Sequence, residues 1–125
     1  MSVILSIKPK YCMRILSGEK EYEFRKRFPR NVETVYMYAT SPIKKLVGKF
    51  TVGDVIEDEP HGLWKKFKTY AGIDEKEFFE YFKGSRIGYA IQIKDLKVFP
   101  PVDPKKIIFK FTPPESYLYT DTLFL

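Results

Sequence analysis

The chain has almost none of the residues that build disulfides and metal centres. Its 125 residues include one cysteine, Cys12, and one histidine, His61. A single cysteine cannot form an internal disulfide, and one histidine does not supply a Cys/His ligand cluster, so we expect no metal and no cofactor. Cys12 shares a predicted apolar helix face with Ile15 and Leu16, which favours a packing residue over a reactive thiol. His61 is expected in a loop.

The sequence also lacks long apolar runs. None approaches the roughly 20 residues of a membrane-spanning helix, and residues 1–7 do not combine a basic stretch with a long apolar one as an export signal does. We therefore expect a cytoplasmic protein with no membrane partner. A hydrophobic content of 44% excludes a disordered chain, and the length predicts a single domain over residues 1–125.

Positive charge is in moderate excess. The chain has 22 Lys and Arg against 16 Asp and Glu, a formal net charge of +6. Five of the basic residues lie between Lys20 and Arg30, and aromatic residues are interleaved with basic ones along the chain. This mixture suits a polyanionic partner, because cations bind phosphates and aromatic rings stack on bases. Charge alone leaves many protein classes open.

The segment from Gly18 to Arg25 is the most informative stretch of the chain. Gly18 follows an amphipathic segment, where a helix ends most easily in a left-handed glycine. From residue 21 the pattern alternates, which puts Glu23 and Arg25 on one face of a predicted strand. Tyr22 and Phe24 lie on the other face. One face suits a core, and the other offers an acid and bases to a single ligand.

Hydrophobic periodicity predicts a strand-rich fold with helical insertions. Strands are expected at Val3 to Lys8, from Glu21, at Thr34 to Thr40, at Leu46 to Ile56 and at Ile87 to Phe99. Helices are expected at Pro9 to Ser17, Pro60 to Tyr70 and Asp74 to Gly84. Gly48 and Gly53 favour bends, Pro100 and Pro101 are expected to break the chain, and an aromatic tail follows Pro113. We predict an α+β fold: a small, strongly bent sheet or barrel with a short amino-terminal helix and an inserted helical hairpin.

The same segment resembles a family signature. Gly18-x-Lys20-x-x-Glu23-x-Arg25 matches the ASCH domain, the activating signal cointegrator homology family, which is similar to the PUA RNA-binding fold. Leu5-Ser6-Ile7-Lys8-Pro9 and Pro113-Pro114-x-Ser116-Tyr117 look like its prokaryotic branch of predicted regulators. The resemblance implies a PUA-like β-barrel with a cleft beside the first helix. It also implies a role in binding RNA or a nucleotide-like ligand through the motif residues.

We predict a basic cleft that binds RNA or a modified nucleoside. Its predicted ligand-binding residues are Ser6, Lys8, Lys20, Glu23, Arg25, Ser116 and Tyr117. Arg25 suits a bidentate contact with a phosphate or a base edge, and we expect Arg25→Ala to weaken binding with little loss of fold. The alternatives are that Glu23 and Arg25 only pair with neighbouring strands at the surface, and that Ser116 and Tyr117 only pack on the sheet.

An enzyme is the second hypothesis. Some ASCH members are small amidohydrolases that deacetylate acetylated cytidine with a lysine, a threonine and a glutamate, and some are reported nucleases. This chain keeps the lysine as Lys20, but Glu23 stands at the threonine position, and a carboxylate between two cations is a poor acyl acceptor and a weak base. A metal-independent amidohydrolase or ribonuclease with Lys20 and Glu23 as its catalytic pair is thus the alternative to binding. A transcriptional regulator is the third, although no recognition-helix pattern stands out.

Overall fold

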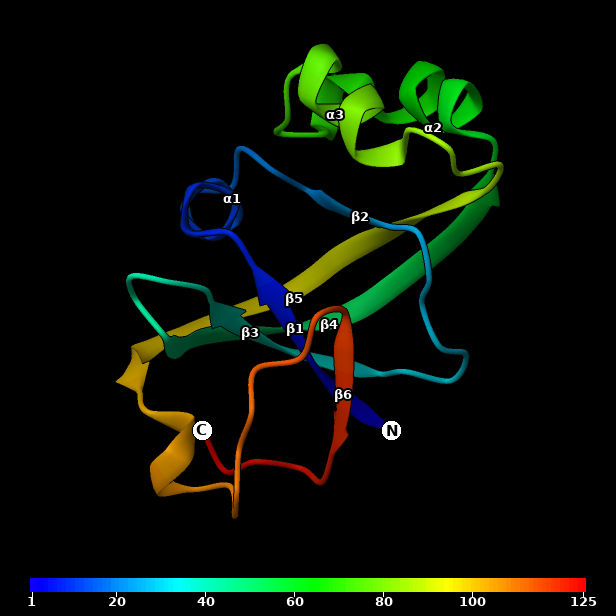
Figure 1. The fold of residues 1–125 in the computed structure, drawn as a ribbon. Helices are drawn as coiled ribbons and strands as arrows, with labels where there is room; N and C mark the ends of the chain where they lie inside the picture. Colours follow the sequence, from blue (N-terminus) through cyan, green and yellow to red (C-terminus); the bar gives the residue numbers. More distant parts are fainter.

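The computed structural model describes residues 1–125 as one six-stranded sheet with three α-helices (Figure 1). The strands are β1 (Ser2–Ile7), β2 (Tyr22–Arg25), β3 (Thr34–Ala39), β4 (Lys45–Asp58), β5 (Gly88–Val102) and β6 (Tyr117–Thr120). The helices are α1 (Pro9–Leu16), α2 (Pro60–Phe67) and α3 (Glu75–Phe82), with short 3₁₀ turns η1 (Lys68–Tyr70) and η2 (Pro104–Lys106). The predicted α+β class is confirmed. None of the helices has the length and apolar character needed to span a membrane.

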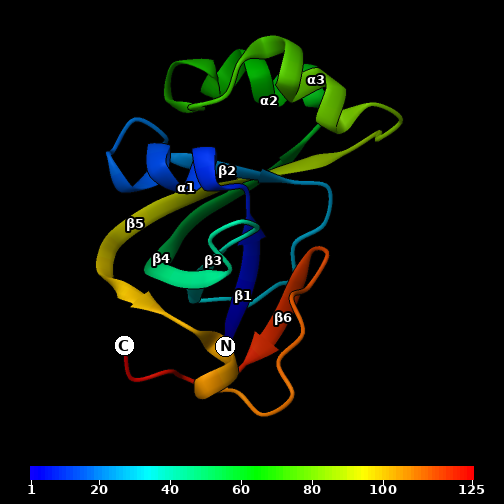
Figure 2. The same cartoon turned by 60° about the vertical axis from the view of Figure 1, so that its left-hand side comes forward.

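The sheet is strongly curved but open. Its strand order is β2-β5-β4-β3-β1-β6, with β1 parallel to β3 and every other pair antiparallel. Figure 2 shows β4 and β5 arching together around β1 and β3. The edge strands β2 and β6 are not paired with each other, so backbone hydrogen bonds do not close the sheet into the expected barrel.

Bulges between β4 and β5 produce part of this curvature. The register shifts near Gly48, where an added Cβ would lie 2.9 Å from the backbone oxygen of Lys97. Beyond it, β5 continues through Pro100 and Pro101 to Val102, so the predicted chain break there is wrong. Both prolines fall in the register shift, where their missing N–H groups cost no ladder hydrogen bond.

Two hydrophobic clusters pack the helices against the sheet. One lies between the sheet and α1 and includes Cys12, as the sequence indicated. The other lies under the α2–α3 hairpin, which covers the far end of β4 and β5 (Figure 1). It consists of Phe24, Leu63, Ala71, Phe78, Phe82 and Ala90. His61 belongs to the first turn of α2 and stacks near Phe79 instead of lying in a loop.

The carboxy-terminal segment adds a strand that the sequence analysis did not predict. β6 pairs with β1, placing Tyr117 opposite Leu5. Before it, the apolar residues from Ile107 form no strand, and Phe109 is almost fully exposed. The predicted aromatic tail is therefore an edge strand followed by a short extension.

Candidate functional site

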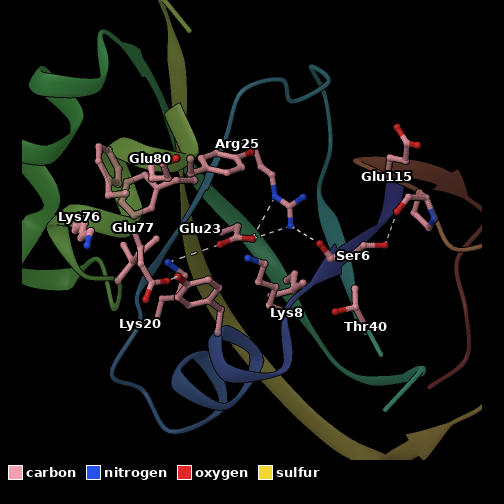
Figure 3. Close-up of a pocket in the computed structure, with 17 residues that line it drawn as sticks. Ser6, Lys8, Lys20, Glu23, Arg25, Thr40, Lys76, Glu77, Glu80 and Glu115 are labelled. Carbon is pink, nitrogen blue, oxygen red and sulfur yellow. Dashed lines mark hydrogen bonds and ion pairs between the residues drawn. The ribbon is translucent and has the colours of Figure 1, made fainter. Parts of the chain in front are cut away.

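A cavity of about 880 Å³, here called the main cavity, lies between α1, β2 and α3 (Figure 3). Its size is in the range of small-molecule sites, about 300–1,000 Å³. The basic residues of its lining are Lys8, Lys20, Arg25 and Lys76, and the acidic ones are Glu23, Glu77, Glu80 and Glu115. Because the two signs are equally represented, the structure does not show the basic cleft expected from the sequence.

Glu23 and Arg25 form a buried ion pair on one face of β2. Arg25 donates from Nε and Nη2 to Glu23 Oε2, at 3.2 and 2.8 Å. Nη2 also donates to the backbone oxygen of Ser6 at 2.7 Å. The two side chains expose only 6% and 8% of their residue surfaces. Arg25 therefore links β2 to β1, although three strands separate them in the sheet order.

Lys20 completes this group, which we call the ion triad. It lies just before β2, and its Nζ donates to the backbone oxygen of Ala71 at 2.6 Å and lies 3.7 Å from Glu23 Oε1. The ammonium group is also 4.9 Å from the ring centroid of Phe24. Burial lowers the pKa of Lys20 below its ordinary value of 10.5, and the charge of Glu23 opposes that shift.

The ion triad changes two expectations. Glu23 and Arg25 pair with each other in a buried setting, not with neighbouring strands at the surface. Removing Arg25 would leave a buried carboxylate with less compensation, so Arg25→Ala is now expected to lower stability as well as any ligand affinity. The remaining nitrogen of Arg25, Nη1, has no protein partner, and the residue lines the main cavity.

The structure brings five of the seven predicted ligand-binding residues to the main cavity. Lys8 is exposed and forms no ion pair, and Ser6 Oγ donates to the backbone oxygen of Pro114 at 2.6 Å. The two others, Ser116 and Tyr117, are not among the lining residues. Tyr117 begins β6 and packs on the core, because its pairing with β1 fixes which way the ring points. Pro114 and Glu115 line the main cavity instead.

The wall contributed by α3 was missed by the sequence analysis. Glu77 of α3 accepts from Lys10 Nζ at 2.7 Å and from the hydroxyl of Tyr11, so it clamps α3 to α1. These two donors, Lys10 first, lower the pKa of Glu77 below its ordinary value of 4.5. Tyr81 lies at the same wall and accepts from the backbone N–H of Lys26 at 3.2 Å. The polar face of the helix was visible in the sequence, but not what it faces.

Comparisons with known proteins identify the family of this chain and agree with its fold. The model of the ASCH domain family matches residues 5–99. The chain is 28% identical over 118 residues to an ASCH domain-containing ribonuclease of Zymomonas mobilis, covering 90% of this chain and 80% of that protein. The crystal structure of ASCH from Zymomonas mobilis is similar with a TM-score of 0.90 at 26% identity, covering 96% of this chain and 87% of that one.

A similar segment also occurs inside a longer protein. The large ribosomal subunit protein uL22 of Ureaplasma parvum is 31% identical over 108 residues, which are 85% of this chain and 34% of that protein. Since the family model spans most of the sequence and includes the segment from Gly18 to Arg25, this chain belongs to the ASCH domain family.

Proposed function

We propose that this protein binds RNA by taking one unpaired base, standard or modified, into the main cavity. The observation behind the proposal is the state of Arg25: Nε and Nη2 are held by Glu23 and Ser6, while Nη1 has no protein partner. A guanidinium fixed in this way loses little conformational entropy when it binds a base edge or a phosphate. Figure 3 shows this group at the centre of the cavity lining.

The other lining residues suit a base and its ribose. Tyr11, Phe24 and Tyr81 supply aromatic surface, and stacking on such surface contributes about 1–3 kcal/mol per base. Lys8 and Glu80 supply an exposed donor and an exposed acceptor for polar edges. A base inside a double helix cannot enter a cavity, so the ligand is single-stranded or presents a flipped-out base.

The family supports the same class of ligand. The Zymomonas relative is named a ribonuclease and shares most of its length with this chain. We also propose that the open sheet is a variant of the PUA-like barrel, in which the Arg25 to Ser6 hydrogen bond joins β2 and β1 where no strand pairing does.

RNA cleavage is the second candidate: the relative is named a ribonuclease, and Lys20 offers a route that needs no metal. A lysine whose pKa is lowered by burial has a larger fraction of neutral amine. That amine would take the proton of a ribose 2′-hydroxyl as the oxygen attacks the adjacent phosphorus. The bond from phosphorus to the 5′-oxygen would break, the leaving oxygen would take a proton from water, and a 2′,3′-cyclic phosphate would form. Glu23 would position Lys20.

The test compares Arg25→Lys with a matched surface change, Arg30→Lys, since Arg30 is exposed. Binding of a labelled single-stranded RNA is followed by fluorescence anisotropy in the presence of EDTA, with thermal unfolding as the control for folding. Arg25→Lys keeps the charge but loses the planar fork, and we expect about a tenfold loss of affinity. Arg30→Lys should bind as the wild type does. Equal affinity of folded Arg25→Lys and wild type would contradict the proposal.

The same samples separate binding from cleavage. If Lys20 supports metal-independent cleavage, RNA is shortened on denaturing gels in EDTA and the products end in cyclic phosphate. Lys20→Met should then abolish cleavage while Arg30→Lys retains it. Intact RNA in a sample that binds it would contradict metal-independent cleavage.

A further inference from the structure

A second cavity of about 610 Å³ adjoins the main cavity. The two share three lining residues, Ser6, Thr40 and Pro114. Figure 3 shows Ser6 and Thr40 at the end of the main cavity opposite Lys76. The two cavities therefore meet at these three residues.

The second cavity differs from the main cavity in charge. Lys44 ends the turn between β3 and β4, Lys45 is the first residue of β4, and Lys105 comes from η2. All three are exposed, and none forms an ion pair. The one acidic lining residue, Asp103, uses Oδ1 to accept from the backbone N–H of Lys105 at 3.0 Å, which caps η2. Two distant segments thus converge to leave a net positive lining.

We propose that the second cavity binds the sugar-phosphate backbone of the nucleotide next to the one held in the main cavity. The ligand is then a single-stranded RNA of two or more nucleotides, not a free nucleoside. This inference rests on the proposed function, since it needs a base in the main cavity. Flexible exposed lysines bind phosphates as point charges without reading sequence, which matches three unpaired lysines beside a site that accommodates one base.

The residues at the junction fit a passing strand. Ser6 Oγ donates to the backbone oxygen of Pro114. This hydrogen bond joins β1 to the segment before β6 and fixes the junction between the two cavities. Thr40 is partly exposed there, and its hydroxyl has no protein partner, which makes it available to a phosphate oxygen. The junction thus offers the strand a rigid support and a free donor.

The experiment removes the three lysines together and uses a charge-matched control. The test variant carries Lys44→Gln, Lys45→Gln and Lys105→Gln. The control carries Lys65→Gln, Lys68→Gln and Lys83→Gln, which are exposed, form no ion pair and line neither cavity. Dissociation constants are measured for a single-stranded RNA oligonucleotide and for nucleoside monophosphates over a series of salt concentrations.

We expect the test variant to lose about tenfold or more in oligonucleotide affinity at low salt. Its slope of log affinity against log salt should become shallower by about 0.7 to 1.4, because each of the one or two phosphates that flank this nucleotide contributes about 0.7 in a single strand. Affinity for nucleoside monophosphates should not change, and the control should keep most of its oligonucleotide affinity. Equal losses in both triple variants, or no loss in either, would overturn the inference.

Different results would contradict the proposed function and the backbone site in the second cavity. If oligonucleotide binding depends on Arg25 but both triple variants behave alike, the second cavity is not a backbone site and the proposed function stands. If the wild type binds neither RNA nor nucleotides, both are wrong.

Discussion

The main cavity and the second cavity use positive charge in opposite ways. In the main cavity, Lys20 and Arg25 are buried and share the carboxylate of Glu23, and in the second cavity the three lysines are exposed and unpaired. Buried pairs fix geometry but depend on every partner, because an uncompensated buried charge is costly. Exposed cations add salt-dependent affinity for phosphates and do not need a fixed side-chain geometry. Selectivity for a base should therefore come from the main cavity, and affinity for the strand from the second.

The largest expected difference between the two cavities is in how substitutions of their charged residues change the free energy of unfolding. Glu23→Gln leaves Lys20 and Arg25 buried without their carboxylate, and we expect it to lower the free energy of unfolding by about 3–5 kcal/mol. Each lysine substitution of the second cavity should change it by about 0.5 kcal/mol or less, as surface substitutions do. Urea unfolding measures both. A Glu23→Gln protein as stable as the wild type would show that the ion triad is not a structural unit.

Lys20→Met sharpens this prediction, because it removes one cation and leaves the pair of Glu23 and Arg25 intact. Its loss of stability should be smaller than that of Glu23→Gln. The reverse order would place the main cost at Lys20 instead.

The next effect tests the packing that holds Lys20 in place. Gly72 and Gly18 both have positive φ, 59° and 85°, so alanine costs about 1–2 kcal/mol at either position. At Gly72 the new Cβ would also lie 2.8 Å from the Cα of Lys20, whereas at Gly18 it meets nothing within 4 Å. We expect Gly72→Ala to be the less stable of the two and to weaken RNA binding, while Gly18→Ala binds normally. Equal behaviour in unfolding and anisotropy would contradict the close packing on Lys20.

The smallest expected effect concerns α3, which lines the main cavity but not the second cavity. Because the folded pKa of Glu77 lies below 4.5, its ionised form stabilises the protein above that pH, and the contribution is lost as pH falls through the folded value. Hydrogen exchange in α3 should accelerate in this acidic range and, at neutral pH, in Glu77→Gln. The matched control is Glu75→Gln, an exposed residue of the same helix without an ion pair. Equal hydrogen exchange in both variants would show that Glu77 does not hold α3 to α1.

Local patterns predicted much of the fold and the centre of the site. Alternation placed Glu23 and Arg25 on one face, and the motif added Lys20, since all three lie within six residues and need no long-range information. The helical hairpin followed from its aromatic stripes. The position of α3 at the main cavity could not be predicted, because a polar helix face that lines a cavity has the same sequence pattern as one that faces solvent.

Long-range pairing explains the remaining differences. Ser116 and Tyr117 were expected at the cleft, but the pairing of β6 with β1 brings Pro114 and Glu115 there instead. The second cavity was missed because Lys44 and Lys105 are far apart in sequence and meet only where η2 folds back toward the β3–β4 turn. Closure of the sheet likewise depends on which edge strands pair, which no local pattern encodes.

The central claim is that RNA contacts the free nitrogen of a fixed Arg25 inside the main cavity. The most direct measurement is an NMR titration of the ¹⁵N-labelled protein with single-stranded RNA, following the Nε–H signal of Arg25 and the backbone amides of Glu80 and Tyr81. We predict saturable shifts of all three signals, with the same dissociation constant as anisotropy gives. RNA binding that leaves the Arg25 signal unchanged and shifts only residues outside the main cavity would contradict the account.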